Sequence, residues 1–298
     1  MNRNGHVTPM DSNDDCGFRL FNTERIDLPL LVSVPHAGRD YPAELHDNLR
    51  IPAAELLRLE DRYADRLVAP AMAAGIPTII ANSARAWMDL NRGVDELDPE
   101  MVSGAIGAPK STGSAKMRGG LGLVPRRLVH SGDLWKQRFP ADEISQRIAN
   151  YHTPYHQTIG QCLSGMATRF GSALLVDIHS MPPLAAAGTH PAPRIVIGDR
   201  FGQSAASIYS EMLLERLKQT GITAALNHPY PGDYILRRHG NARKNIHAIQ
   251  IEVDRSLYLD SELREPGDGM EATAALVVDL LMLLADLLGG LPLPLAAE

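Results

Sequence analysis

The stretch SALLVDIHS, residues 172–180, places a run of apolar residues directly before an Asp-Ile-His sequence. A short continuous apolar run of this kind is typical of a strand buried on both faces of a sheet. The segment LLVSV, residues 30–34, has the same character and stops at Pro35. Both segments predict buried strands, and each brings a histidine, His36 or His179, to its carboxyl end.

The rest of the chain alternates between strand and helix patterns. Strands are predicted over 78–81, 86–90, 194–197 and 247–253, and helices over 52–74, 140–170, 203–218 and 272–288. This alternation predicts an α/β fold, a three-layer α/β/α sandwich with a mixed, mostly parallel sheet. Ligands of such sheets bind beyond the carboxyl ends of the strands, where His36, His179 and Glu252 are expected.

The composition is that of a globular protein, with 298 residues of which 44% are hydrophobic. We expect a flexible tail over residues 1–25 and a single domain over 26–298. The formal net charge of -6 argues against binding to nucleic acid or to an anionic membrane. An anionic substrate must therefore be held by a local cluster of arginines.

Two further features indicate the compartment and the assembly. The chain has two cysteines, Cys16 and Cys162, and no apolar signal segment near its start, so a cytoplasmic protein is expected. The apolar run 272–288 is interrupted by Asp279 and Asp286, which a membrane span would avoid. We expect an amphipathic helix that packs on the core or on a second subunit, which leaves a homo-oligomer open.

Residues 93–127 are rich in Gly, Ser, Pro and Lys and show almost no periodicity. A loop of this length in a compact domain is usually functional or disordered. It is expected to cover a site at the strand ends.

Two imidazoles and one carboxylate form a standard catalytic zinc set, because three protein ligands leave a fourth position for water. His36 and His179 follow predicted strands, and Asp61 falls in the helix after the first strand. A single histidine in such a place is more often a hydrogen-bonded structural residue, so it is the combination of three residues that indicates a metal site.

A carboxylate within an apolar strand needs a partner or a function, because its burial costs several kcal/mol. Glu252 in IQIEVDR is such a group and is a candidate general base, the alternative being a half-exposed strand. Asn91 and Arg92 form a candidate carboxylate clamp, and Arg85 a candidate oxyanion partner, although isolated arginines are more often surface residues.

Other catalytic patterns are not met. His152 and His156 are four residues apart, but no glutamate follows His152 and Pro154 lies between them, so the zinc protease helix is not matched. The Gly-rich segment 119–124 lacks the Lys-Ser/Thr of a phosphate loop, and the chain has no Gly-x-Ser-x-Gly sequence.

Six segments resemble the N-formylglutamate amidohydrolase family in order and spacing. They are SVPHAG (33–38), LEDRYAD (59–65), MDLNR (88–92), LLVDIHS (174–180), GDYILRRHG (232–240) and IHAIQIE (246–252). The resemblance covers residues 30–288 and implies a zinc carboxypeptidase-like fold and hydrolysis of N-formyl-L-glutamate to L-glutamate and formate. It implies metal ligation by His36, Asp61 and His179, a general base at Glu252, and a carboxylate clamp at Asn91 and Arg92.

The sequence departs from the expected pattern in two places. The carboxypeptidase spacing of His and then Glu three residues later is absent, since Arg39 stands there, so the second ligand is Asp61 or Glu60. In the segment 232–240, Tyr234 and Arg237 are expected to contact the substrate, and an additional arginine, Arg238, favours a more anionic ligand.

Alternatives remain at three levels. The metal is expected to be zinc, but sites of this ligand type accept other divalent ions. The substrate is expected to be a small anionic N-acyl amino acid, with another N-acyl amino acid or a peptide-like amide as the runner-up. A non-catalytic carboxylate-binding protein, or an interaction protein whose histidines belong to the core, would come from a different functional class.

Overall fold

A seven-stranded mixed sheet organises the chain. The computed structural model describes residues 17–104, 114–186, 188 and 191–290. The strand order is β1-β3-β2-β8-β11-β9-β10. The strands are β1 (Phe18–Phe21), β2 (Leu30–Val34), β3 (Thr78–Ala81), β8 (Ala173–Met181), β9 (Ile195–Gly198), β10 (Ala224–Leu226) and β11 (Ile246–Asp254). Only the pairs β1/β3 and β9/β11 are antiparallel, so the predicted mixed, mostly parallel sheet is confirmed.

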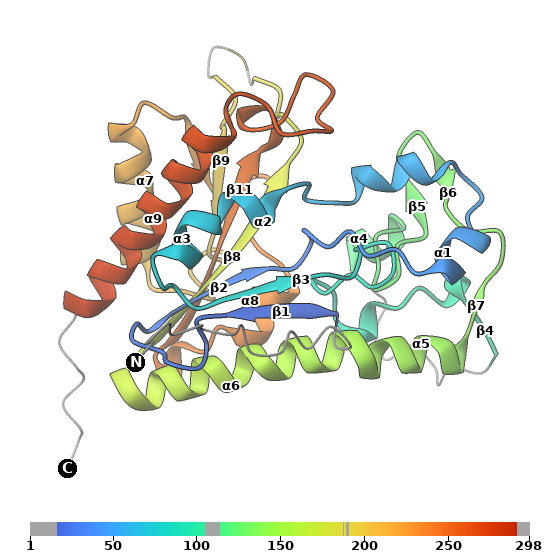
Figure 1. Cartoon of the computed structure of the whole chain (residues 1–298), viewed down its shortest axis with the longest axis horizontal. Helices are drawn as coiled ribbons and strands as arrows, with labels where there is room; N and C mark the ends of the chain where they lie inside the picture. Colours follow the sequence, from blue (N-terminus) through green and yellow to red (C-terminus); the bar gives the residue numbers. More distant parts are fainter. Residues whose placement is uncertain (1–16, 105–113, 187, 189–190, 291–298) are drawn as a thin grey trace, which may run out of the picture.

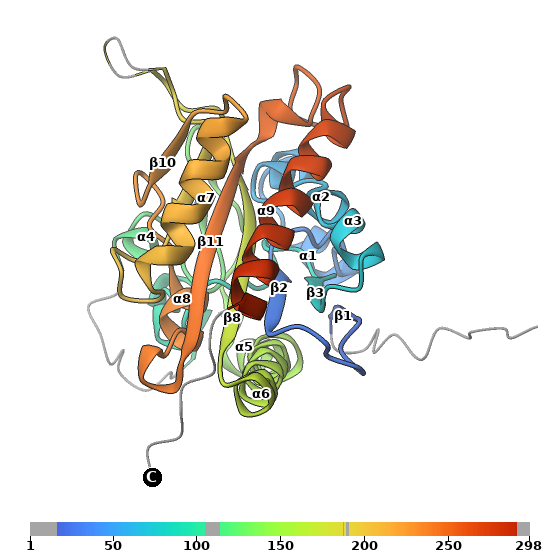
Figure 2. The ribbon, with the colours of Figure 1, turned by 90° about the vertical axis from the view of Figure 1, so that its left-hand side faces the viewer.

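Helices cover both faces of this sheet (Figures 1 and 2). One face packs against α6 (Thr153–Phe170) and α8 (Tyr234–His239). The other face packs against α2 (Ala64–Leu67), α3 (Ala69–Ala73), α7 (Ser207–Gln219) and α9 (Met270–Gly290). Every residue of β2, β8 and β11 is buried, which explains the continuous apolar runs of β2 and of the first half of β8.

The α6 face of the sheet changes from apolar to polar along the strands. In β8, Leu175 belongs to the core beneath α6, and the next residues on the same face are Asp177 and His179. In β11, Ala248 is followed on that face by Gln250 and Glu252. The polar side chains therefore gather at the carboxyl ends of the central strands, as the sequence predicts.

The helix predicted over 52–74 is wrong as a single element. The chain forms a 3-10 helix, η2 (Ala53–Arg58), and then α2 and α3, with a break at residues 59–63. Within the break Tyr63 has a φ of 57°, and the backbone N–H of Asp61 donates to the carbonyl of His36 at 2.9 Å. The break fixes Asp61 beside His36, which an unbroken helix would not do.

Two other expectations are corrected. The strand predicted over 86–90 is a turn, in which the N–H groups of Trp87 and Met88 both donate to the carbonyl of Ala84. The tail predicted over 1–25 is wrong for Phe18–Phe21, which form edge strand β1 and pair with β3. Residues 1–16, which include Cys16, lie outside the described part of the chain.

The predicted helix over 140–170 is confirmed as α5 (Ala141–Arg147), a π-helical turn η5 (Ile148–His152), and α6. The C-terminal helix is confirmed as α9. By length and composition α9 is apolar enough to span a membrane. It instead packs on α2, α3 and α7, with Val277, Leu281 and Leu284 fully buried and Asp279 paired to Arg216 at 2.6 Å.

The predicted loop over 93–127 contains short elements in its described part. These are η3 (Val94–Glu96), η4 (Pro99–Met101), β4 (Val102–Ser103) and α4 (Ala115–Arg118), and residues 105–113 are outside the described range. Near them lie α1 (Ala43–Asp47), β5 (Arg127–Leu128), β6 (Gly132–Asp133) and β7 (Phe139–Pro140). Figure 1 shows this group beside the sheet, on the right of the view. The remaining short helices are η6 (Ala242–Lys244) and η7 (Arg255–Leu257).

Candidate active site

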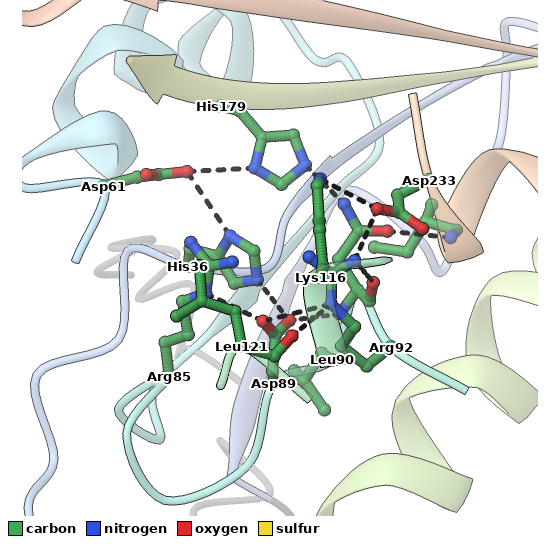
Figure 3. A network of polar contacts seen from close by, with 12 residues as sticks. His36, Asp61, Arg85, Asp89, Leu90, Arg92, Lys116, Leu121, His179 and Asp233 are labelled. Carbon is green, nitrogen blue, oxygen red and sulfur yellow. Dashed lines mark hydrogen bonds and ion pairs between the residues drawn. The ribbon is translucent and has the colours of Figure 1, made fainter. Parts of the chain in front are cut away.

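Three buried side chains from separate segments meet at the ends of β2 and β8. His36 follows β2, Asp61 lies in the break before α2, and His179 lies near the end of β8. One nitrogen or oxygen atom from each residue lies within 4.8 Å of those of the other two. Asp61 is central, because its Oδ2 lies 2.9 Å from Nδ1 of His179 and 3.6 Å from Nδ1 of His36 (Figure 3).

A buried carboxylate contacts Nε2 of each imidazole, the ring nitrogen that does not face Asp61. Nε2 of His36 lies 2.8 Å from Oδ1 of Asp89, and Nε2 of His179 lies 2.7 Å from Oδ2 of Asp177. A carboxylate oxygen accepts, so Nε2 of each ring donates, and Nδ1 of His179 also donates to Asp61. A cation bound by His179 and Asp61 would take the place of this second proton. This is the carboxylate–histidine arrangement that supports metal ligands.

The cluster fits a divalent cation. Nδ1 of His36 is buried and has no hydrogen-bond partner. Ligands held at zinc distances in a tetrahedral site lie about 3.3 Å apart, and the two separations from Asp61 Oδ2, 2.9 and 3.6 Å, lie on either side of this value. The donor set, its spacing and the unpartnered nitrogen all agree with a metal held by these three residues.

The electrostatics favour a cation at the same place. Burial alone would raise the pKa of Asp61, but the hydrogen bond from His179 and the nearby His36 imidazole hold that pKa well below its usual range. Burial alone would lower the pKa of His179, but the charge of Asp177 and hydrogen bonds to Asp177 and Asp61 raise it well above its usual range. The site therefore retains positive charge between fixed carboxylates.

Glu60, the alternative ligand, points elsewhere. Its carboxylate accepts hydrogen bonds from the hydroxyl of Tyr41 and, at 2.9 Å, from the guanidinium of Arg62. Asp61 is held in place by Arg255, whose guanidinium lies 3.1 Å from its Oδ1 and also bonds the backbone carbonyl of Glu60. Of these two neighbouring carboxylates, Asp61 is the one that the structure brings to the histidines.

Glu252 is placed beside His179 by the sheet. The two residues are partners in the parallel register of β8 and β11. The side-chain amide of Gln250 donates to Oε1 of Glu252 at 2.9 Å. Burial raises the pKa of Glu252 to about 7, which suits a group that both accepts and donates a proton near neutral pH.

These groups line a cavity of about 230 Å³, here called the site cavity. Its wall includes the three clustered residues, Glu252, Asn91, and five basic residues, Arg58, Arg85, Arg92, Lys116 and Arg255. Nε of Arg85 lies 2.8 Å from Oδ2 of Asp89, which leaves its terminal nitrogens for a ligand. Lys116 and Leu121 come from the predicted loop 93–127, part of which therefore lies at the site as expected.

Asn91 and Arg92 are expected from the sequence to bind a substrate carboxylate, but both side chains already have partners within the protein. Arg92 is 1% exposed, and its guanidinium bonds the backbone carbonyls of Leu121 and Asn91 and pairs with Asp233. Asn91 accepts a hydrogen bond from the backbone of Ile235, while its amide nitrogen lies 3.3 Å from Nε2 of His179. The carboxylate of Asp233 already lies between Arg92 and Lys116 (Figure 3).

A buried histidine cluster holds the backbone on both sides of Asn91. Nε2 of His156 lies 2.9 Å from the carbonyl of Leu90, and Nε2 of His152 lies 2.8 Å from that of Arg92. His239 stacks on His156 and bonds its Nδ1 at 2.9 Å. The His152 and His156 pair thus supports the turn that carries Asn91, a role that the sequence pattern does not reveal.

Tyr234 and Arg237 do not line the site cavity. The ring of Tyr234 is buried against His152 and His156. Arg237 has a half-exposed side chain that lies 3.9 Å from Glu96. Tyr234 therefore packs on the histidine cluster rather than in the site cavity, and Arg237 lies apart from the candidate metal ligands.

Several residues of the site are not identified by sequence reasoning. They are Asp89, Asp177, Gln250, Arg255, Lys116 and Asp233. Asp89 and Asp177 lie within the segments MDLNR and LLVDIHS. Each is a carboxylate inside an apolar run, and this feature could have identified them from the sequence. Lys116 and Asp233 have no such signal, because only the tertiary structure brings them together.

Comparison with known proteins agrees with this arrangement. The family model described as N-formylglutamate amidohydrolase matches residues 28–259. N-formylglutamate deformylase of Pseudomonas aeruginosa is 29% identical over 267 residues, which cover 85% of this chain and 91% of that protein. The deformylase of the same name from Pseudomonas putida is 30% identical over 240 residues, which cover 78% of this chain and 82% of that protein.

A solved structure is similar across nearly the whole chain. The crystal structure of N-formylglutamate amidohydrolase from Ralstonia eutropha JMP134 superposes with a TM-score of 0.85 at 27% identity. The match covers 92% of this chain and 99% of that one. With the family match, the two bacterial relatives and the shared fold, the chain belongs to the N-formylglutamate amidohydrolase family of hydrolases.

Proposed function

We propose that this protein is a metal-dependent amidohydrolase that converts N-formyl-L-glutamate and water to L-glutamate and formate, with zinc as the expected metal. The main support is the convergence of His36, Asp61 and His179, with Glu252 beside them in the sheet. The names of the relatives point to the same substrate. Binding alone would not need a buried carboxylate next to a metal site.

Each residue has a proposed role. A divalent ion held by Nδ1 of His36, Nδ1 of His179 and the Asp61 carboxylate would supply a Lewis acid that polarises the acyl carbonyl and lowers the pKa of water. Glu252 takes the proton of the attacking water and delivers it to the leaving amine. Gln250 holds Oε1 of Glu252 and leaves Oε2 for this transfer.

The basic side chains have two proposed roles, stabilisation of the oxyanion and binding of the substrate carboxylates. Arg85 is fixed by Asp89 and supports the negative charge that develops on the carbonyl oxygen. The carboxylates of the amino acid bind towards Asn91, Arg92 and Lys116, where they exchange places with the carboxylate of Asp233. We assign no substrate contact to Arg237, because it does not line the site cavity.

Formate release from N-formyl-L-glutamate tests the function directly. The purified protein is assayed as prepared, after treatment with a chelator, and after zinc is added back. We expect release to stop with the chelator and to return with zinc. Unchanged release after complete metal removal would refute the metal-dependent mechanism, and absence of release from zinc-loaded protein would refute the substrate.

A further inference from the structure

A second cavity adjoins the site cavity. It has a volume of about 480 Å³ and shares four wall residues with the site cavity, namely Arg58, Leu121, Pro182 and Arg255. Because these residues line both spaces, the two cavities adjoin, and the pair is here called the cleft. A formyl group contains a single carbon and has no use for a compartment of this size.

The wall of the second cavity has a distinct chemistry. Leu57, Val129 and Leu263 contribute apolar surface, and Val129 is 70% exposed. Four guanidinium groups, of Arg58, Arg127, Arg255 and Arg264, face two carboxylates, of Glu55 and Glu262. Each arginine has a carboxylate partner: Arg58 pairs with Glu55, Arg127 with Asp133, Arg255 with Asp61 and Arg264 with Glu262. The partners of Arg127 and Arg255 do not line the second cavity, so both guanidinium groups face it without an acidic neighbour on its wall.

The two ends of the cleft lie on opposite sides of His179. Arg255, which faces the second cavity, binds Asp61 at the Nδ1 side of the His179 ring. Asn91 approaches the Nε2 side of the same ring, next to Arg92 and its partner Asp233. A substrate whose amino-acid carboxylates bind near Arg92 would therefore direct its acyl group towards the second cavity.

We propose that the second cavity is an acyl subsite for a chain of several carbons that ends in a carboxylate. Methylene groups would pack on the apolar wall, and the arginines would bind the terminal carboxylate. Hydrolysis breaks the C–N bond, the acyl carbon gains the oxygen of water to form a second carboxylate, and the amine takes the proton. This inference rests on the proposed amide hydrolysis and widens its substrate class.

The test compares three N-acyl derivatives of L-glutamate: formyl, butanoyl and succinyl. The last two have acyl chains of four carbons and differ in the terminal carboxylate. We expect kcat/KM for the succinyl compound to exceed that for the butanoyl compound by at least about 10-fold. In an R127A/R264A double variant this preference should disappear, while formyl hydrolysis stays unchanged, because neither arginine lines the site cavity.

Folding of the double variant is not expected to be affected, since the two side chains are 52% and 61% exposed. The control is Arg243→Ala, which removes an exposed arginine of η6 that lines neither cavity. Equal rates for the succinyl and butanoyl compounds in the wild type would overturn the proposal. So would a succinyl preference that survives in the double variant.

A binding measurement separates this proposal from the proposed function. Succinate and butanoate are titrated into the wild-type protein and into the double variant by calorimetry. If no N-acyl glutamate is hydrolysed, stronger binding of succinate that is lost in the double variant would still support the subsite. If formyl hydrolysis occurs but both acids bind equally or not at all, the subsite is refuted and the function stands.

Discussion

Asp89 fixes the orientation of His36, because its Oδ1 lies 2.8 Å from Nε2 of the imidazole. Burial would raise the pKa of Asp89, but the charge of Arg85 and its other cationic neighbours hold this pKa well below its usual range. The carboxylate therefore stays ionised and keeps the ring proton on Nε2. Nδ1 of His36 is left to face Asp61 with its lone pair, as a metal ligand requires.

Asp89→Asn should weaken metal binding. An amide at this position no longer selects one tautomer of His36, and loss of such a partner typically costs 10- to 100-fold in metal affinity. Zinc affinity measured by competition with a chromophoric chelator should fall by roughly this factor. Asp279→Asn is the control, since it removes a carboxylate of α9 that pairs with Arg216. Equal zinc affinities for wild type and Asp89→Asn would contradict the role of Asp89.

Glu252→Gln should remove turnover and leave the metal in place. The amide cannot accept the proton of water, and loss of a general base typically costs 10²- to 10⁴-fold in rate. We expect kcat to fall by at least about 100-fold, while the zinc content by elemental analysis stays at the wild-type value. Glu271→Gln, at an exposed position of α9, should behave as the wild type. A near-normal rate in Glu252→Gln would exclude this residue as the base.

Asp233→Asn should strengthen the binding of acidic substrates. Asp233 pairs with Arg92 and with Lys116, and both cations lower the pKa of its carboxyl against the effect of burial. Without this charge the two cations are available to the substrate, and we expect KM to fall by roughly 10-fold, equivalent to about 1.4 kcal/mol. Asp268→Asn, which changes an exposed aspartate, is the matched control. An unchanged or higher KM would show that the substrate carboxylates bind elsewhere.

His156→Ala should impair catalysis through the turn that carries Asn91. The substitution removes the hydrogen bond to the carbonyl of Leu90 and the stacking with His239. We expect kcat/KM to fall by about 10-fold, since small displacements of positioning groups cost this much or more. His156→Gln can still donate to the Leu90 carbonyl and should recover part of the loss. If both variants have equal rates, the hydrogen bond has no positioning role.

The same cluster should make stability dependent on pH. Burial lowers the pKa of His239 to about 3 and also lowers the pKa values of His152 and His156. The pKa of a histidine in an unfolded chain is about 6.5. Below this pH the unfolded chain binds protons that the folded chain does not bind, so the free energy of unfolding falls as pH decreases. His239 contributes roughly 1 kcal/mol per pH unit between these two pKa values, and His152 and His156 act in the same direction.

Urea unfolding between pH 7.5 and pH 4.5 measures this slope. His239→Gln should reduce the slope, because one of the titrating groups is gone while the amide can still donate to His156. The comparison concerns the slope with pH, so a uniform loss of stability in the variant does not affect it. An identical slope in wild type and variant would show that other groups dominate the acid response.

Much of the fold follows from local sequence. The apolar runs at 30–34 and 172–178 predict strands that are buried on both faces, and β2 and β8 are the most central part of the sheet together with β11. These runs are informative because a parallel sheet covered on both faces accepts few polar residues. His36, His179 and Glu252 stand out for the same reason, as polar side chains at the ends of apolar strands.

Local sequence fails where long-range contacts override helix or strand periodicity. The pattern over 52–74 is helical, but the buried charges of Glu60, Asp61 and Arg62 find partners on other segments, and the helix breaks there. Residues 86–90 form a short, mostly apolar run like that of a strand, yet Asp89 pairs with His36 and Arg85, and the backbone turns.

The sequence alone determined the α/β fold, the central strands and the residue types of the candidate metal site. Only the tertiary structure decided that Asp61 rather than Glu60 meets the histidines, that Asp233 lies against Arg92, and that a second cavity adjoins the site. The physical reason is that strand burial is encoded in neighbouring residues, whereas the partner of a buried charge lies on a distant segment. Such pairs are fixed only when the whole chain is packed.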